Sequence, residues 1–449
     1  MTHIEQSMEP IDRVIKLLDV EDFKTLSTLL ASQEPAEITR LLESLPDPKR
    51  AMLWKLLPQG ITGDVLANLG EIARISLVDT ISQDDVVNAT ATLETQDLAD
   101  VIETLPEEIS DAIRESLDYR GLRNLEATLA FPEDSAGRLM DTEAVAVRAD
   151  VDLETVLRYL RRRESLPVHT AALMVVDRKG RFQGELPISS LLTRQPDRQV
   201  LDVMSPDAER VRPDMKQRDL AILFRDRDLI SVAVVDEDEI LIGRVTIDDI
   251  VDIMQEEADH QILGAAGLDE AEDLFAPVLP SAQRRALWLG INLGTAFLAA
   301  WVIGLFEATL DKVVALAILM PIVASMGGIA GSQTLTLIIR GLALGHISSS
   351  NTRWLAYKEI AISVLNGIVW ALVVGVISYF WFHDVRISGV LGAAMVINML
   401  AAAFSGVVIP LLMKKSGIDP ALAGSVVLTT VTDVIGFMSF LGLATIFLL

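Results

Sequence analysis

The 449-residue sequence has no cysteine, only five histidines, and far fewer basic than acidic residues. Without cysteine the chain can form neither disulfides nor thiolate metal sites, and its scattered histidines do not have the spacing of an ordinary zinc site. The 38 Lys and Arg residues stand against 63 Asp and Glu, a net charge of −25. Nucleic-acid affinity comes from basic residues that neutralise phosphates, so this charge argues against a nucleic-acid partner and favours cations. The N-terminus lacks an apolar segment, and we expect no cleaved signal peptide.

The charge is divided unevenly along the chain. Residues 281–449 contain six of the acidic and nine of the basic residues, so residues 1–280 carry the other 57 acids and 29 bases. Hydrophobic residues nevertheless make up 51% of the sequence. The sequence therefore predicts a strongly acidic first part joined to an apolar second part.

The second part contains long apolar segments. They cover residues 286–306, 313–339, 358–382, 387–413 and 420–449, and each supplies the ~20 residues that a membrane-spanning helix needs. Basic residues concentrate in three places: before the first segment, in the connection from the second to the third, and in the connection from the fourth to the fifth. The positive-inside rule then predicts a multi-pass protein of the cell (inner or plasma) membrane, with a cytoplasmic N-terminus and the C-terminus outside.

Asp433 is the most informative residue of the apolar part. It lies within the fifth segment, where a carboxylate is costly and by default marks a functional site. Ser425 and Thr429 precede it at intervals of four residues, which indicates a shared helix face. We interpret this face as the lining of a wet pore; the alternative is a cluster of hydrogen bonds between helices around a protonated Asp433.

A second polar cluster lies in the second apolar segment, where Gly327, Gly328 and Gly331 precede Ser332, Gln333 and Thr334. Glycines favour close approach of backbones. We expect the cluster, with Gln333, to line the pore or to lie beside it, which is compatible with small-residue helix packing.

Two internal similarities organise the acidic part. Residues 41–46 and 101–106 are similar within a region of helical periodicity from 10 to 130, which suggests repeated helix–turn units. Residues 139–191 and 203–250 match more clearly, and each copy has the pattern strand, helix, strand, turn, strand, helix. This pattern resembles a tandem pair of CBS modules, a regulatory fold that often binds adenine nucleotides.

Acidic side chains gather where the second copy leads into the membrane part, and again in the helical region. Like charges about 5 Å apart repel by roughly 3 kcal/mol at an effective dielectric near 20, so faces that carry them come together only around a cation. Mg²⁺ prefers carboxylate oxygens and suits this role; the alternative is a solvated acidic surface. The candidate regulatory metal ligands are Asp248, Asp249, Asp252, Glu256 and Glu257, with Asp97 and Asp100 as partners.

Several stretches together resemble the MgtE family of magnesium channels and transporters, over nearly the whole chain. They are residues 131–137 (FPEDSAG), 245–252 (VTIDDIVD), 331–334 (GSQT), 419–421 (DPA) and 430–433 (TVTD). The sequence departs from many family members at Ile329 and Arg138, and from some at Ser425. A weaker polar lining leaves passage of Co²⁺ or Mn²⁺ open.

The resemblance implies a homodimer with ten spans and a pore on the twofold axis. It implies that the two Asp433 side chains bind a hydrated Mg²⁺, and that cytoplasmic Mg²⁺ at acidic interfaces closes the channel through a connecting helix at about 251–276. It leaves ATP binding at the CBS pair open.

We therefore expect a multidomain protein with an all-α superhelical N-terminal domain (1–135), an α/β tandem CBS pair (136–250), a connecting helix (251–280) and an all-α membrane domain with five transmembrane helices (281–449). The expected function is import of Mg²⁺ down its electrochemical gradient. The alternatives are a carrier coupled to H⁺ or Na⁺, with Asp433 as the coupling carboxylate, and a membrane-anchored nucleotide sensor. We expect no enzyme, because the sequence contains no nucleophile–base constellation and no phosphate loop.

Overall fold

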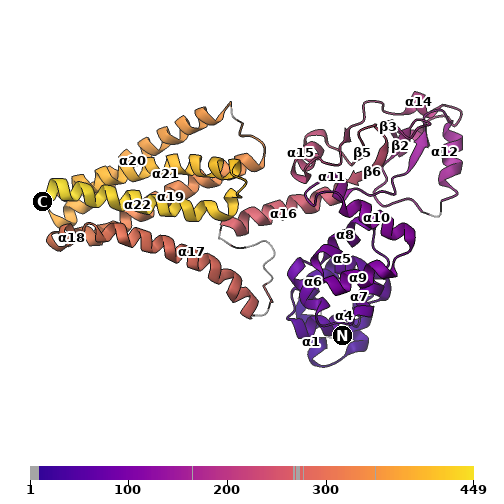
Figure 1. Cartoon of the computed structure of the whole chain (residues 1–449), viewed down its shortest axis with the longest axis horizontal. Coiled ribbons are helices and arrows are strands. Elements are labelled where there is room, and N and C mark those ends of the chain that lie inside the picture. The colour runs from indigo at the N-terminus through magenta and orange to yellow at the C-terminus, as the bar shows by residue number, and fades with distance from the viewer. Residues whose placement is uncertain (1–9, 164, 266–267, 269–273, 277, 349) are drawn as a thin grey trace, which may run out of the picture. The chain divides into compact units, whose positions relative to one another are not determined.

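A computed structural model describes residues 10–163, 165–265, 268, 274–276, 278–348 and 350–449. The chain divides into two compact units (Figure 1). The first unit comprises residues up to Glu257, and the second comprises Ala258–Glu270 and Val278–Leu449. The predicted multidomain architecture is confirmed, with a helical domain, a pair of small sheets and a set of long apolar helices.

The first part of the first unit is a helical domain. Its helices are α1 (Pro10–Asp19), α2 (Phe23–Leu30), α3 (Pro35–Glu43), α4 (Asp47–Trp54), α5 (Thr62–Asn68), α6 (Glu71–Val78), α7 (Gln83–Thr90), α8 (Thr95–Thr104), α9 (Glu107–Ser116) and α10 (Tyr119–Leu129), with a 3₁₀ turn at Gln59–Ile61. Their apolar faces share one core, which explains the helical periodicity of the sequence.

The short internal similarity marks two equivalent helix pairs. Pro46 precedes α4 and Pro106 precedes α9, and in both places the proline ends one helix and starts the next. In both pairs a carbonyl near the end of the first helix accepts a hydrogen bond from a side chain of the second helix, Leu42 O from Arg50 Nε (3.0 Å) and Ile102 O from Ser110 Oγ (2.9 Å). The predicted repeated helix–turn unit is therefore present.

The longer repeat forms two three-stranded sheets of the same design. The first copy contains α11 (Ala136–Leu139), β1 (Ala146–Arg148), α12 (Leu153–Leu160), β2 (Ala172–Val176), β3 (Phe182–Pro187) and α13 (Ile188–Thr193), and the second contains α14 (Val200–Val203), β4 (Arg210–Val211), α15 (Gln217–Arg227), β5 (Ser231–Val235) and β6 (Leu241–Thr246). The sheet orders are β1-β2-β3 and β4-β5-β6, with a parallel first pair and an antiparallel second pair in each. The predicted strand and helix order is confirmed.

Helix α16 (Ile247–Ala265) follows β6 directly and belongs to the first unit up to Glu257 and to the second from Ala258. It differs from the expected connecting helix, because it begins four residues before 251 and ends at Ala265. Residues 274–276 form a turn, and the expected helical residues 266–267 and 269–273 lie outside the described residues. Asp248 and Asp249 occupy its first turn, where carboxylates interact favourably with the helix dipole.

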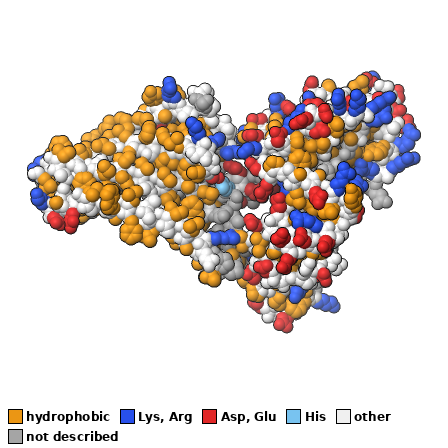
Figure 2. Space-filling model, viewed as in Figure 1, with side chains coloured by type: hydrophobic (Ala, Val, Ile, Leu, Met, Phe, Trp, Pro, Cys, Tyr) orange, Lys and Arg blue, Asp and Glu red, His pale blue; other side chains and the backbone are white. Residues whose placement is uncertain are grey.

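The second unit is built from α17 (Val278–Gly304), α18 (Glu307–Lys312), α19 (Ala315–Ala343), α20 (Thr352–Phe382), α21 (Val385–Lys415) and α22 (Pro420–Leu448). Among the described residues, five of these helices, all but α18, are long and apolar enough to cross a membrane, which agrees with the five apolar segments. In Figure 2 hydrophobic side chains cover the visible face of this unit, whereas acidic and basic side chains cover the first unit. A lipid bilayer is the environment that such a surface fits.

Small residues let α19, α21 and α22 pack closely. A Cβ atom at Gly331 of α19 would lie 3.0 Å from Leu428 of α22, and one at Gly406 of α21 would lie 2.9 Å from Thr334 Cβ of α19. Helix pairs in membranes associate through such contacts. Part of the predicted glycine cluster therefore serves helix packing.

We expect Gly184→Ala to destabilise the first sheet by about 3 kcal/mol or more, since both backbone conformation and space exclude a side chain there. Gly184 has φ +148°, and a Cβ atom would lie 2.3 Å from Ser205 O. Thermal unfolding of the purified chain measures the loss of stability. Limited proteolysis of the same chain shows whether residues 136–250 are the part that becomes susceptible.

Gly180→Ala is the matched control, because Gly180 also has a positive φ (+81°) but the nearest atom to its Cβ would be 3.6 Å away. This substitution should lower the free energy of unfolding by about 1 kcal/mol, the penalty of a left-handed backbone conformation for a residue with a Cβ atom. Equal destabilisation by both substitutions would show that the contact with Ser205 contributes nothing.

Candidate functional site

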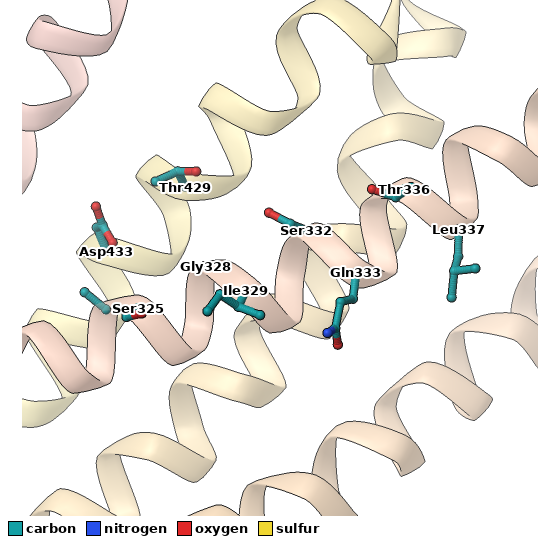
Figure 3. Close-up of a pocket in the computed structure, with 10 residues that line it drawn as sticks. Ser325, Gly328, Ile329, Ser332, Gln333, Thr336, Leu337, Thr429 and Asp433 are labelled. Atoms are coloured by element: carbon teal, nitrogen blue, oxygen red, sulfur yellow. The ribbon is translucent and has the colours of Figure 1, made fainter. Parts of the chain in front are cut away.

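An open cavity of about 910 Å³ lies between α19 and α22 in the second unit. Its lining from α19 is Ala324, Ser325, Gly328, Ile329, Ser332, Gln333, Thr336 and Leu337, and its lining from α22 is Thr429 and Asp433. The α19 residues recur every three or four positions, so they form one face of that helix. In Figure 3 Ser332 turns toward the side of α22 that carries Thr429 and Asp433, and Gln333 points away from them.

Asp433 is the acidic residue of this lining, and it is half-buried. Within the described part of the chain its carboxylate has no ion pair and no hydrogen bond to a side chain. An unpaired carboxylate in an apolar helix bundle attracts a cation, whose charge offsets the cost of burial. The hydroxyls of Ser325, Ser332 and Thr429 add neutral oxygens that can bind the waters of a hydrated ion.

The structure brings three of the four predicted pore residues into the cavity. Asp433, Thr429 and Gln333 line it, whereas Ser425 does not. Ser425 contributes its backbone carbonyl, which accepts a hydrogen bond from Thr429 Oγ1 at 2.8 Å. Ser325 was missed by the sequence analysis, although its spacing from Gly328 and Ser332 would have placed it on the same helix face.

A second set of acidic side chains lies in the first unit, at the predicted regulatory site. Burial is the largest cause that raises the pKa of Asp97 to about 6 and that of Asp249 to about 7. The charge of Asp248 raises both values further, and that of Asp97 adds to the shift of Asp249. The acids of α8 and of the first turn of α16 are therefore near enough to repel one another, as the sequence analysis assumed.

Asp100 differs from Asp97 in that it forms an ion pair with a basic residue. Arg138 Nε lies 3.2 Å from Asp100 Oδ1, and its terminal nitrogen lies 2.7 Å from Glu103 Oε2. The Arg138 side chain is only 1% exposed. Arg138 therefore connects α8 to the first residues of the CBS-like pair through its guanidinium group. A metal ion was the predicted partner of Asp100.

The other predicted regulatory residues are dispersed along α16. Asp248 lies 3.5 Å from His169 Nε2 and accepts a short hydrogen bond from Thr246 Oγ1. Glu257 lies 3.6 Å from an Arg218 nitrogen. Burial raises the pKa of Asp252, and Glu256 is exposed. No three His, Asp or Glu side chains of the described residues are grouped as a ready ligand set for a metal ion.

A contact that the sequence analysis missed joins α16 to α22 within the second unit. His260 Nε2 lies 2.6 Å from Asp419 Oδ2, and Asp419 also caps α22 by accepting a hydrogen bond from Ala421 N. One turn later a Cβ atom at Gly264 would lie 3.2 Å from the Ala421 backbone. The last turns of α16 therefore pack on the first turn of the helix that carries Asp433.

We expect the acid cluster to make the first unit less stable as the pH rises from about 4 to about 7. Asp97 and Asp249 have raised pKa values in the folded state, so over this range the folded chain binds more protons than the unfolded chain, and stability falls with rising pH. Thermal unfolding at pH 5.5 and 8.0, with and without Mg²⁺, measures this dependence; Mg²⁺ should recover part of the loss at pH 8.0.

Asp249→Asn should flatten the pH dependence, since the amide oxygen can still accept from Thr246 N but carries no charge. Glu108→Gln removes one charge from an exposed acid of α9 and serves as the control. An unchanged slope in the Asp249 variant would mean that this carboxylate is not destabilised in the folded chain.

Three family models match the chain. The model described as divalent cation transporter matches residues 320–443, that of the MgtE intracellular N domain matches 33–134, and that of the CBS domain matches 136–197 and 200–256. The first of these matches includes all the residues that line the cavity.

Whole-length relatives are also found. The chain is 31% identical to the magnesium transporter MgtE of Thermus thermophilus over 95% of its own length and 96% of the relative's. It is 26% identical to the magnesium transporter MgtE of Bacillus subtilis, with 98% of each chain covered. Among solved structures, the cytosolic domain of the Mg²⁺ channel MgtE in complex with ATP matches with 31% identity and a TM-score of 0.50, over 54% of this chain and 99% of that one. The chain therefore belongs to the MgtE family of divalent cation transporters.

Proposed function

We propose that the protein is a homodimeric Mg²⁺ channel that imports magnesium down its electrochemical gradient and closes when cytoplasmic Mg²⁺ is high. The observation that carries this proposal is the unpaired Asp433 carboxylate in the cavity between α19 and α22. The names of the two whole-length relatives, both magnesium transporters, support Mg²⁺ as the ion.

The lining of the cavity suits a hydrated ion. Mg²⁺ loses its waters reluctantly, and one carboxylate with several hydroxyls can hold it through those waters. Conduction needs binding that is favourable enough for entry and weak enough for release, and retained waters meet both demands. Because the cavity is open, a second copy of α19 and α22 with its own Asp433 is the partner that would complete it. Co²⁺ and Mn²⁺ have the same charge and remain candidate ions.

The proposed sensor is the set of acids in the first unit: Asp97, Asp248, Asp249, Asp252, Glu256 and Glu257. When Mg²⁺ binds between α8 and the start of α16 it removes their repulsion and stabilises the closed state, and when Mg²⁺ leaves, the repulsion favours the open state. Helix α16 is the proposed connection, since it starts beside these acids and ends on α22 through His260 and Gly264.

Topology and nucleotide binding complete the proposal. The basic ends of α19 and α21, with Arg340, Lys414 and Lys415, favour a cytoplasmic N-terminus and a C-terminus outside. The four parts at 1–135, 136–250, 251–280 and 281–449 would then act as helical sensor, CBS pair, connection and pore. The solved cytosolic domain of the relative was bound to ATP, so ATP is a candidate ligand of the CBS pair here.

We expect Asp433→Asn to abolish most Mg²⁺ uptake into liposomes that contain the purified protein. A charge pair about 4 Å apart is worth about 4 kcal/mol at a dielectric of 20, so loss of the charge should lower uptake by more than about tenfold. Uptake should be unaffected by an imposed H⁺ or Na⁺ gradient, which separates a channel from a coupled carrier.

Asp311→Asn is the matched control, because it removes the same charge from an exposed acid of α18. Equal uptake by wild type and the Asp433 variant would show that the ion site does not include Asp433. No uptake by either, together with tight nucleotide binding, would favour a nucleotide sensor.

We expect Asp97→Asn and Asp249→Asn to weaken inhibition by Mg²⁺ on the cytoplasmic side, by about tenfold in the inhibitory concentration, since each removes a buried charge that a cation would neutralise. Asp100→Asn should shift it by less than about threefold, because Arg138 already neutralises that carboxylate. Inhibition curves from inside-out proteoliposomes measure the shifts. An Asp100 variant with the largest shift would contradict the sensor assignment.

A further inference from the structure

The side chain of Asn398 lies in the interior of the membrane unit, away from the cavity lining. It belongs to α21 and is 0% exposed. Its Nδ2 donates a hydrogen bond to Val323 O of α19 at 2.8 Å. Its Oδ1 is buried and, within the described residues, accepts no hydrogen bond. A buried acceptor without a donor costs more than the single hydrogen bond returns, so stability alone does not account for this amide.

Two glycines on different helices face the amide of Asn398. A Cβ atom at Gly327 of α19 would lie 2.2 Å from Asn398 Nδ2, and one at Gly436 of α22 would lie 2.7 Å from the same nitrogen. Neither position can carry a side chain while the amide is in place. The amide of α21 thus occupies the space between the two helices that form the cavity.

The three contact points are close in sequence to cavity-lining residues. Val323 precedes Ala324, and Gly327 precedes Gly328, both of which line the cavity. Gly436 follows Asp433 by three residues, which is less than one turn of α22. The amide therefore contacts α19 and α22 at the level of the Asp433 carboxylate.

We propose that Asn398 is a positioning residue that sets the separation of α19 and α22 at Asp433, and through it the affinity and selectivity of the ion site. This inference rests on the proposed function, in which Asp433 binds the transported ion. The amide is planar and is held by Val323 O on one side and by two glycine backbones on the others, so it defines a narrow spacing. A side chain of another size or without a donor changes that spacing, and with it the number of waters that a hydrated cation keeps between Asp433 and the α19 hydroxyls.

The experiment measures Mg²⁺ uptake by proteoliposomes for Asn398→Ala, Asn398→Leu and Gly436→Ala. We expect each to shift the half-saturating Mg²⁺ concentration by about threefold or more and to change the ratio of Mg²⁺ to Co²⁺ uptake, since the geometry of a charged site controls which hydrated ion it holds. Gly442→Ala is the control on the same helix, because a Cβ atom there meets nothing within 4 Å. It should leave half-saturation and the ion ratio as in wild type.

A purely structural role predicts a different result, in which the maximal rate falls with the amount of folded protein while half-saturation and the ion ratio stay constant. That result in the folded variants would overturn the proposal. If the Asn398 variants do not fold, the proposal is tested by comparing the half-saturating Mg²⁺ concentration and the ion ratio of Gly436→Ala with those of Gly442→Ala. The double variant Asn398→Ala/Gly436→Ala should regain part of the wild-type half-saturation, because a Cβ atom at 436 then fills space that the amide has left.

Asp433→Asn, measured in the same assay, separates this inference from the proposed function. Uptake that survives in the Asp433 variant would reject the ion site itself. Uptake lost in that variant, with wild-type half-saturation and ion ratio in the folded Asn398 and Gly436 variants, would reject only the positioning role.

Discussion

One unpaired negative charge in an apolar helix bundle is the constraint on which the membrane unit depends. A carboxylate at that depth costs several kcal/mol unless a cation or water reaches it. Asp433 therefore requires an open, wetted cavity, and the serine and threonine hydroxyls of α19 and α22 supply its polar surface. Around that cavity many helix contacts are made by small and apolar residues, such as Gly331 against Leu428.

The first unit depends on the same interaction of carboxylates, arranged differently. Asp97 and Asp249 are partly out of water and lie among other carboxylates, so their ionised forms are disfavoured. Asp100, three residues from Asp97, is neutralised by Arg138. Helix α8 thus carries a carboxylate that is ion-paired, Asp100, and one, Asp97, that has no ion pair within the described residues. The Arg138 pair joins the helical domain to the CBS pair, and in the proposed function the unpaired Asp97 is the carboxylate that a cation would neutralise.

Sequence reasoning predicted the architecture well, because its signals are local or repeated. Apolar segments of about 20 residues specify membrane helices, and the CBS-like pattern occurs twice in register. Asp433 was predicted because a charge in such a segment stands out without any tertiary information. Ser425 was placed beside it on spacing alone, whereas the lining that α22 contributes to the cavity consists of Thr429 and Asp433.

The remaining features depend on contacts between distant parts of the chain, which no local pattern reveals. Arg138 meets Asp100 across 38 residues, and His260 meets Asp419 across 159. Asn398 resembles the other isolated asparagines of the apolar part until Gly327 and Gly436 are seen against its amide. The described part of α16 ends at Ala265, so the predicted extent of the connecting helix over residues 266–267 and 269–273, which lie outside the described residues, stays a prediction.

Helix α22 is the element on which all these features converge. Its first turn is capped by Asp419 and contacted by α16, its middle carries Thr429 and Asp433, and the next turn packs on Asn398 through Gly436. A helix is stiff along its axis, so a movement imposed at Asp419 by α16 reaches Asp433 fourteen residues later as a shift or rotation of the whole helix. In our proposal, the contact between Gly436 and Asn398 opposes that movement close to Asp433. In the proposed channel, the contact with α16 is where a movement would reach α22, and the contact with Asn398 would limit how far the Asp433 carboxylate moves.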